Sequence, residues 1–441
     1  MTAPSRGNGQ PGRADPTTAG FDGLVARVRG LAASELARRL GPTSLFAPSA
    51  DDEALAWAVI SERLAEAHRE HVLGGGRPLD QDVRERAAQA VFDALLGFGP
   101  LEPYLAQEDL EELLVNGHQR AFVIRAGGRK QRIDSGFGSE AALRAFAAAK
   151  VAAAGRRLDE AHPRADARLR DGSRLHVICP PLAPYTCLTV RRHRLLAHSI
   201  DDLLALGTLT AAVAGLLGAV VRGGLNLLIS GGTGAGKTTT LNAIASEIPV
   251  LDRVVTIEET KELALDRHLD DHIGLEARFA NVEGIGEVGI RELVRDALRM
   301  RPARIIVGEV RGPEALDMLN AMNSGHEGSM GTIHASSARQ ALSKLHTYTK
   351  MADAALADAV VAEMIAQTVE VVCQLRLLPD GRRVLSELVE VAGVEGGRML
   401  ANELVRLGPN GTPVFTGVRP RATDRLVAAG WDPTALTGRP A

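Results

Sequence analysis

The chain has 441 residues, of which 45% are hydrophobic and 24% are charged, the ordinary mixture of a soluble globular protein. Its length predicts two or three domains. Because 51 basic residues stand against 54 acidic ones, the formal net charge is only -3, and no nucleic-acid partner is expected. Three irregularly spaced cysteines exclude a disulfide framework and a cysteine-based zinc site, and they favour a reducing compartment.

The N-terminal region divides into an irregular start and a helical head. Residues 1–50 begin with Pro, Gly and charged residues and lack the apolar segment of a signal peptide, so we expect them to be mostly disordered or accessory. Residues 51–110 predict a helical head, because apolar residues recur every three or four positions in Asp51–Val72 and Gln81–Leu96. The glycines Gly74, Gly75 and Gly76 separate these two predicted helices.

Residues 111–198 predict a small α+β lobe of short strands and one helix. The helix is expected over Ser139–Ala154, and the segment Arg191–Asp202 is typical of a linker to the next lobe. Glycine-containing turns between the strands predict hairpins. The expected strands are Leu113–Val115, Ala121–Arg125, Lys130–Asp134, Arg164–Leu169, Arg174–Ile178 and Cys187–Arg191.

The uncharged stretch Leu203–Val221 approaches the length that spans a bilayer. Several glycines and threonines interrupt it. A turn near Gly207, followed by a short helix capped by Thr208 or Thr210, accounts for this stretch better than a membrane span.

Residues 199–395 predict an α/β lobe, because strands and helices alternate in a way that indicates a parallel sheet covered on both faces. Val369–Leu377 and Arg383–Val391 add an expected antiparallel pair. Residues 396–441 predict a Gly- and Pro-rich tail with a short helix at Ala422–Ala429. The strands expected in the parallel part are Asn226–Ser230, Arg253–Ile257, Arg304–Val307 and Gly331–His334.

The strongest chemical motif is GGTGAGKT at Gly231–Thr238, which fits the phosphate-binding pattern G-x-x-x-x-G-K-[ST] between a predicted strand and a predicted helix. Glycines let backbone N–H groups converge on phosphate oxygens at a helix N-terminus, whose dipole favours anions. Lys237 adds a positive charge for the terminal phosphates, and the Thr238 hydroxyl suits Mg²⁺. The motif therefore predicts an ATP and Mg²⁺ site, with nucleotide contacts from Gly231, Gly232, Thr233, Gly234, Ala235, Gly236, Lys237, Thr238 and Thr239.

Two predicted strands end in carboxylates. Glu309 follows a strand that resembles a Walker B strand in which Gly308 replaces the usual aspartate. Glu258 and Glu259 end a second strand. Because ligands of open α/β sheets lie at the carboxyl ends of the strands, these residues are candidates for catalysis, and Glu258 or Glu309 for holding Mg²⁺ through water.

The histidines carry weaker signals. His326 and His334 lie near a strand end, but their spacing matches no usual zinc site. His268 and His272 are one helical turn apart beside two aspartates, and a solvated acidic face explains them better than a metal site.

Taken together, these segments resemble the type II/type IV secretion ATPase superfamily, and within it the tight-adherence (Flp) pilus assembly ATPases of the CpaF/TadA-like branch. The resemblance extends from about Asp80 onward, and residues before about Asp51 are not covered. The segments that resemble the superfamily are the P-loop (Gly231–Thr238), Ile257–Thr260, Ala297–Pro302, Ile305–Arg311 and Gly325–His334. Those that resemble the pilus branch are Leu114–Gly117, Asp166–Leu169, Asp171–Arg174 and Thr416–Arg421.

The resemblance implies a RecA-like P-loop lobe with a parallel-rich sheet, preceded by a PAS-like α+β lobe and a helical head. It further implies a homo-hexameric ring with ATP between the two lobes of each subunit. Glu258 and Glu259 match the family's acidic "Asp box", although Asp is common at the position of Glu259. Glu309 matches its Walker B motif, and His334 matches its "His box".

Arginines of the first lobe would reach the terminal phosphate in such a protein, and the best matches are Arg168, Arg191 and Arg192. The expected function is an ATP-hydrolysing motor that powers assembly or retraction of a Flp pilus or a related secretion machine. Its partners would be polytopic inner-membrane platform proteins, which places it in the cytoplasm on the membrane face. The alternatives are a conjugation-type traffic ATPase that moves DNA or protein, and a nucleotide-binding regulatory or scaffold protein with little turnover.

Overall fold

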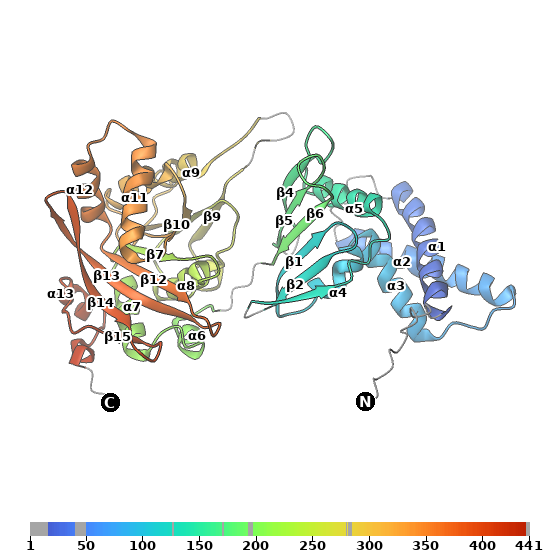
Figure 1. Ribbon diagram of the computed structural model, residues 1–441, viewed down its shortest axis with the longest axis horizontal. Helices are drawn as coiled ribbons and strands as arrows, with labels where there is room; N and C mark the ends of the chain where they lie inside the picture. Colours follow the sequence, from blue (N-terminus) through green and yellow to red (C-terminus); the bar gives the residue numbers. More distant parts are fainter. Residues whose placement is uncertain are drawn as a thin grey trace, which may run out of the picture. The chain divides into compact units, whose positions relative to one another are not determined.

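The computed structural model describes residues 16–39, 50–125, 128–169, 172–192, 197–278, 280 and 285–437. The chain forms two compact units, residues 1–192 and residues 193–441 (Figure 1). The predicted fold class is confirmed, because the second unit is an α/β P-loop lobe with a parallel-rich sheet and the first contains a helical head and an α+β lobe.

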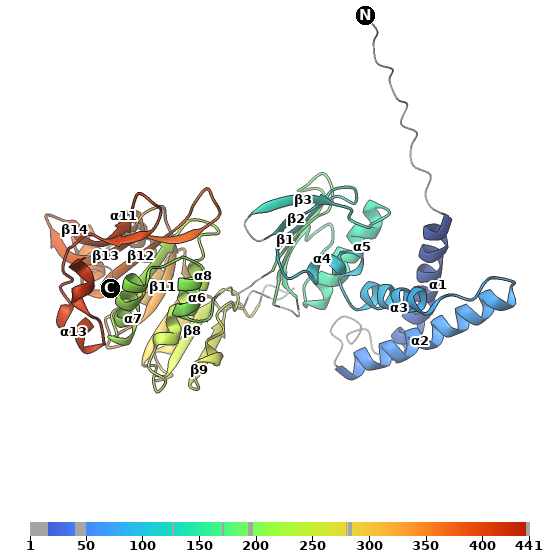
Figure 2. The same ribbon diagram turned by 90° about the horizontal axis from the view of Figure 1, so that it is seen from below.

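Three helices form the helical head of the first unit (Figure 2): α1 (Pro16–Arg39), α2 (Ala50–Leu73) and α3 (Gln81–Leu95). They share one apolar cluster, in which Leu36 of α1 and Ile60 of α2 are fully buried. Residues 1–50 are expected to be mostly disordered or accessory; the expectation of disorder is wrong for α1, and an accessory segment stays a prediction. This helix is ordered because its apolar residues recur every four positions and pack against the other two helices.

A six-stranded antiparallel sheet follows in the first unit, with the strand order β3-β2-β1-β6-β5-β4. One face packs on α5 (Glu140–Ala153), whose Leu143 and Val151 are fully buried. Ser139 caps this helix by accepting a hydrogen bond from the Ala142 N–H at 3.2 Å. Two short elements, η1 (Gly99–Leu101) and α4 (Glu102–Leu105), join the head to the sheet. The strands are β1 (Leu110–Asn116), β2 (Ala121–Arg125), β3 (Arg129–Ile133), β4 (Arg164–Arg168), β5 (Arg174–Ile178) and β6 (Cys187–Arg191).

The second unit contains a nine-stranded sheet in the order β15-β14-β13-β12-β7-β11-β10-β8-β9. Strands from β12 to β9 in this order are parallel to their neighbours, and β13, β14 and β15 extend the sheet in antiparallel fashion. The nine strands are β7 (Leu227–Gly231), β8 (Val254–Glu258), β9 (His272–Glu276), β10 (Arg304–Val310), β11 (Met330–His334), β12 (Val371–Leu377), β13 (Arg383–Glu395), β14 (Arg398–Leu407) and β15 (Pro413–Phe415).

Helices cover both faces of this sheet, as the sequence predicts (Figures 1 and 2). Leu227 and Ile229 of β7 belong to the cluster on one face, whereas Leu228 belongs to the cluster on the other. The alternation shows that β7 is buried from both sides, which fixes the strand that leads into the P-loop. The first face carries α6 (Ile200–Ala205), α7 (Ala211–Arg222), α8 (Lys237–Ile244) and η2 (Ala245–Glu247); the second carries α9 (Ile290–Ala297), α10 (Glu314–Met322), α11 (Ala338–Ala352) and α12 (Asp358–Thr368).

The uncharged stretch Leu203–Val221 forms parts of two short helices, α6 and α7, joined through a turn in which Gly207 has a φ of 70°. Eight residues of α7 are buried in the core of the second unit. Among the helices that the structure describes, none is long and apolar enough to cross a membrane.

The C-terminal region is more ordered than the sequence predicts. The short helix is present as α13 (Thr423–Ala428), followed by η4 (Pro433–Thr437), but β14 and β15 complete the large sheet. The sequence predicts that the P-loop lobe ends at residue 395, which is the last residue of β13. Because β14 and β15 belong to the same sheet, the lobe extends at least to Phe415. β14 pairs with β13 across the turn at Gly396 and Gly397, and β15 pairs with β14, so hydrogen bonds to a neighbouring strand order residues whose mostly exposed side chains do not predict a strand.

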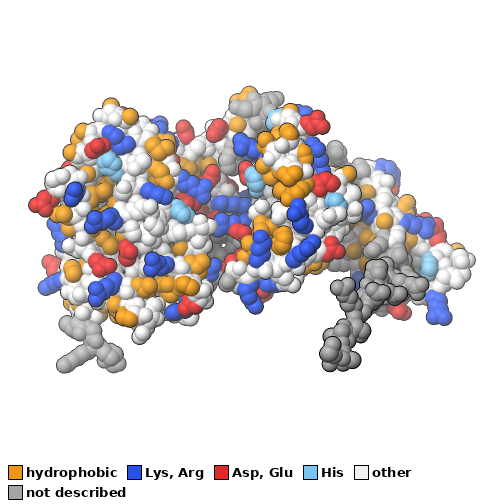
Figure 3. Space-filling model, viewed as in Figure 1, with side chains coloured by type: hydrophobic (Ala, Val, Ile, Leu, Met, Phe, Trp, Pro, Cys, Tyr) orange, Lys and Arg blue, Asp and Glu red, His pale blue; other side chains and the backbone are white. Residues whose placement is uncertain are grey.

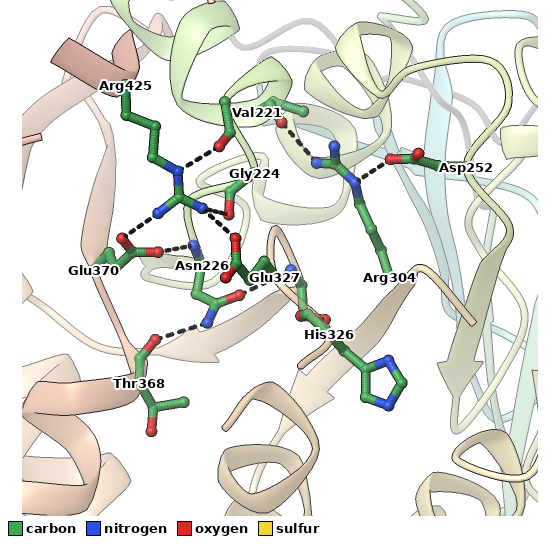
Figure 4. A network of polar contacts seen from close by, with 12 residues as sticks. Val221, Gly224, Asn226, Asp252, Arg304, His326, Glu327, Thr368, Glu370 and Arg425 are labelled. Carbon is green, nitrogen blue, oxygen red and sulfur yellow. Dashed lines mark hydrogen bonds and ion pairs between the residues drawn. The ribbon is translucent and has the colours of Figure 1, made fainter. Parts of the chain in front are cut away.

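A polar network fixes α13 to the sheet at the amino ends of three parallel strands (Figure 4). The Arg425 guanidinium lies 2.9 Å from the Glu370 carboxylate, 3.0 Å from the Glu327 carboxylate and 2.5 Å from the Gly224 carbonyl oxygen. Asn226 donates to the Thr368 carbonyl at 2.9 Å and accepts from the Ser329 N–H at 3.0 Å. The network therefore joins the starts of β7, β11 and β12 and leaves their opposite ends for the site described next.

Candidate functional site

The P-loop connects β7 to α8 in the second unit. Gly234 and Gly236 have φ values of 72° and 90°, a backbone conformation that residues with a Cβ rarely adopt. Lys237 Nζ donates to the carbonyl oxygens of Gly231 and Gly232, each at 3.2 Å, so the side chain folds back over the loop. The loop and the start of α8 together direct backbone N–H groups and a positive charge to one place, which suits a phosphate group.

The ends of four neighbouring strands meet beside this loop. The sheet order places β7, β11, β10 and β8 side by side, and β11 pairs with β7 so that His334 lies opposite Gly231. Glu309 lies in β10, and Glu258 is the last residue of β8. The expectation that Glu258 and Glu309 share one sheet edge with the P-loop agrees with this arrangement.

Glu258 is a buried carboxyl, with only 3% of its surface exposed. Its Oε1 atom accepts hydrogen bonds from the backbone N–H groups of Glu262 at 2.9 Å and Leu263 at 3.1 Å. Burial is the largest influence on its pKa, and together with the nearby charges of Glu262 and Glu276 it raises the pKa to about 7 despite these hydrogen bonds. Glu258 can therefore exchange a proton near neutral pH.

Gly308 makes room for this carboxyl. A Cβ built on Gly308 would lie 2.8 Å from Glu258 Cγ, closer than carbon atoms approach in proteins. The glycine in the Walker B-like strand is thus explained by the neighbouring strand, because the Glu258 side chain occupies the space that a larger residue would need.

The raised pKa predicts a pH dependence of stability. Because the folded-state pKa lies above the ordinary value of 4.5, the contribution of Glu258 is fully present below about pH 4.5 and is lost as the pH rises to about 7. The loss amounts to about 3 kcal/mol. Glu258→Gln cannot ionise, so its melting temperature relative to the wild type is expected to rise between pH 4.5 and pH 7.5. Glu363→Gln, on the exposed side of α12, is the matched control; an equal difference at both pH values would contradict the buried, titrating carboxyl.

Glu309 is held by Arg311, a residue that the sequence analysis did not select as part of the site. The Arg311 guanidinium donates to the Glu309 carboxylate at 2.6 Å and to the Glu259 carboxylate at 2.7 Å. Burial opposes ionisation of Glu309, but the hydrogen bond and charge of Arg311, with the charge of Lys237, outweigh it and hold the pKa of Glu309 below its usual value. Glu309 is therefore ionised at neutral pH.

His326 and His334 lie at opposite ends of β11. His334 is at the carboxyl end beside the P-loop, where burial and the charges of Lys237 and Lys344 lower its pKa and keep it neutral. His326 precedes the amino end, and its Nδ1 lies 3.0 Å from the Pro302 carbonyl oxygen. Only His334 is therefore placed to respond to a ligand at the P-loop.

The expectation of a solvated acidic face at His268 and His272 is wrong for His272. Its side chain is fully buried, and its ring nitrogens lie 2.5 Å from the Asp266 carboxylate and 3.0 Å from the Thr256 hydroxyl. The two histidines do not share a helix, because His272 starts β9. Within the described ranges, no three His, Cys, Asp or Glu side chains are placed to hold a metal by themselves.

The donors present fit ATP with Mg²⁺. The half-exposed hydroxyl-bearing residues Thr238 and Thr239 lie in the first turn of α8, and Glu258 and Glu309 end nearby strands. Oxygen ligands of this kind suit Mg²⁺, which is commonly completed by nucleotide phosphates and water instead of a full protein cage.

Residues 94–398 match the protein family described as Type II/IV secretion system protein. The chain belongs to this family. A Mycobacterium tuberculosis protein whose name links it to conjugal transfer is 40% identical over 309 residues, which are 68% of this chain and 86% of that protein. A Bordetella bronchiseptica protein named as a homologue of the type IV secretion system protein PtlH is 34% identical over 268 residues, covering 56% of this chain and 78% of that protein. The crystal structure of the VirB11 ATPase from the Brucella suis type IV secretion system is 25% identical, with a TM-score of 0.36, and the match covers 66% of this chain and 95% of that one.

In this secretion-system family member, the candidate arginines lie in the first unit and have different surroundings. The Arg192 guanidinium donates to the backbone carbonyls of Leu105 at 2.7 Å and Gln107 at 2.8 Å, which ties the end of β6 to the segment before β1. Arg191 is exposed, and its Nε lies 3.9 Å from the Glu112 carboxylate. Arg192 thus has a structural task, whereas Arg191 extends from the sheet.

Strand register adds an arginine that the sequence analysis missed. Arg168 pairs with Arg174 across β4 and β5, and Arg174 pairs with Arg191 across β5 and β6, so the three stand in one row. Their neighbours along the strands, including Leu175 and Val190, are buried in the cluster that packs on α5, which places the row on the opposite face. Basic side chains are prominent over the strands of this unit (Figure 3). Arg191 pairs in turn with Glu112 across β6 and β1, so the row of three arginines ends at a carboxylate.

Proposed function

We propose that this protein is an ATP-hydrolysing motor of a secretion or pilus machine. The observation that carries the proposal is the convergence of Glu309, Glu258 and His334 on the edge of the sheet that holds the P-loop. Family membership supports it independently. A homo-hexameric ring at the cytoplasmic face of the membrane, working on polytopic platform proteins, is the assembly that best fits such a motor.

Each side chain has a task in this proposal. Lys237 and the N–H groups of the P-loop would bind the phosphates, and the Thr238 hydroxyl would be a ligand of Mg²⁺. Mg²⁺, when bound, neutralises phosphate charge. Glu309, ionised at neutral pH, orients a water molecule and accepts its proton. Glu258 supports this position from the adjacent strand.

The arginine row of the first unit supplies positive charge to the transferred phosphoryl group. Guanidinium groups stabilise the charge that develops on that group. Arg168 and Arg191 remain the best candidates among the arginines selected from the sequence, and Arg174 joins them. Arg192 is the weakest candidate, because two backbone carbonyls hold its guanidinium.

Two kinds of cargo are compatible with such a motor, and each gives one branch of the proposal. The Thr416–Arg421 motif favours a motor for assembly or retraction of a tight-adherence pilus, whereas the names of the relatives favour a conjugation-type traffic ATPase. Deletion of the gene, followed by electron microscopy for pili and by a mating assay, separates the branches. Loss of pili with normal mating supports the first branch, and the reverse supports the second.

Steady-state ATP hydrolysis by the purified full-length chain with Mg²⁺, combined with measurement of its molecular mass, tests the proposed motor. Turnover by a hexamer is the expected result. Tight ATP binding by the assembled ring without turnover would instead support a regulatory or scaffold protein.

A further inference from the structure

Arg383 contacts the P-loop from outside the nucleotide motif. It is the first residue of β13, and its Nε donates to the Gly234 carbonyl oxygen at 2.8 Å. Its aliphatic part lies against Gly236, where an added Cβ would meet Arg383 Cδ at 3.3 Å. One side chain from the β12–β13 hairpin therefore touches both glycines that have positive φ values in the loop.

The hairpin is fixed next to the loop by the sheet itself. β12 is a parallel neighbour of β7, and Leu375 pairs with Gly231 at the start of the P-loop. Leu377, two residues further, lies 4.0 Å from the position of a Cβ built on Gly234. Arg383 thus extends from a rigid support that follows the P-loop along its outer side.

The hydrogen bond from Arg383 Nε to the Gly234 carbonyl oxygen orients the peptide group between Gly234 and Ala235. In a trans peptide the carbonyl of Gly234 and the N–H of Ala235 point in opposite directions. With the carbonyl held toward Arg383, the Ala235 N–H points away from the hairpin and remains within the loop, where it donates to the Gly232 carbonyl at 3.3 Å. The Gly234–Ala235 peptide is thus held from both sides. Without the Arg383 contact only the 3.3 Å hydrogen bond within the loop would restrain it, and the entropy lost on ordering it would reduce the affinity for phosphate.

We propose that Arg383 is a positioning residue that preorganises the P-loop for the β-phosphate of a nucleoside di- or triphosphate. The inference rests on the proposed ATPase function and extends it to a residue outside the nucleotide motif. If Arg383 has this role, its contribution to the binding free energy is the same for ATP, ADP and inorganic pyrophosphate, because all three place a phosphate group in the P-loop.

The test compares Arg383→Ala and Arg383→Lys with Arg382→Ala in the full-length chain. Arg382 is the matched control, because it is adjacent, pairs with Asp380 at 2.8 Å and belongs to the same hairpin. ATP turnover gives KM and kcat, and calorimetric titration with ADP and with pyrophosphate gives Kd. For Arg383→Ala we expect KM and both Kd values to rise about five- to tenfold with kcat within about twofold of the wild type, the size of one net hydrogen bond acting through the loop.

Arg383→Lys is expected to recover part of the affinity, since its ammonium group can still donate to the carbonyl. It also keeps the test valid if the alanine variant does not fold. Arg383 variants that match Arg382→Ala, or that lower kcat with KM unchanged, would overturn the positioning role alone while wild-type turnover upholds the proposed function. A wild-type chain that neither binds ADP nor hydrolyses ATP would overturn the proposed function itself, and the positioning role with it.

Discussion

Replacement of Glu309 by Gln is expected to lower kcat for ATP hydrolysis by about 10²- to 10⁴-fold, the usual contribution of a general base. The amide keeps the size of the side chain but accepts no proton from water. The P-loop and Lys237 are unchanged, so ATP binding is expected to remain within about threefold of the wild type. Steady-state turnover and calorimetric titration with a nonhydrolysable ATP analogue measure the two quantities separately.

Loss of activity in Glu309→Gln could also come from a broken ion pair, because Arg311 bridges Glu309 and Glu259. Glu259→Gln is therefore the informative companion: it breaks the same bridge from the other side while leaving Glu309 in place. We expect Glu259→Gln to retain most of the turnover. If both variants lose activity equally, the bridge and not the Glu309 carboxylate carries catalysis, and the assigned base is wrong. Glu363→Gln, exposed on α12, controls for the substitution itself.

The strands that hold the site could be predicted from the sequence, because each is a short, mostly buried apolar run with a distinctive residue at or near its end. β7 is buried at all five positions and leads into the P-loop, and β8 is buried at all five and ends in Glu258. Burial on both faces of a parallel sheet produces such runs directly. The candidate residues at their carboxyl ends followed from the same pattern.

The edges of the sheet could not be predicted in this way. β9 is half-buried at most positions, and β14 has mainly exposed residues, so neither shows a continuous apolar run. β9 is stabilised by pairing with β8, and β14 by pairing with β13, which precedes it by a two-residue turn. Contacts that depend on strand register could not be predicted either. Arg174 lies between Arg168 and Arg191, and Gly308 lies beside Glu258, only because the strands pair in one register.

Gly308→Ala tests the closest of these contacts, because the new methyl group would lie 2.8 Å from Glu258 Cγ. Glu258 cannot easily move away, since it is buried and its carboxyl is held by two backbone N–H groups. We expect a loss of stability of about 1–3 kcal/mol, typical of overpacking in a well-packed core. A displacement of about 1 Å at the site is expected to reduce turnover about 100-fold.

A double-mutant cycle identifies the cause. In the Glu258→Ala background the obstructing Cγ is absent, so adding Gly308→Ala is expected to change the free energy of unfolding by less than about 0.5 kcal/mol. Gly215→Ala in α7 is the control for a glycine substitution without a nearby atom, and it should be neutral or stabilising by up to about 1 kcal/mol. Thermal and urea unfolding of the four proteins of the cycle measure these terms. An undiminished cost of Gly308→Ala in the Glu258→Ala background would show that the strand requires glycine for its backbone, and that Glu258 does not set the identity of this residue.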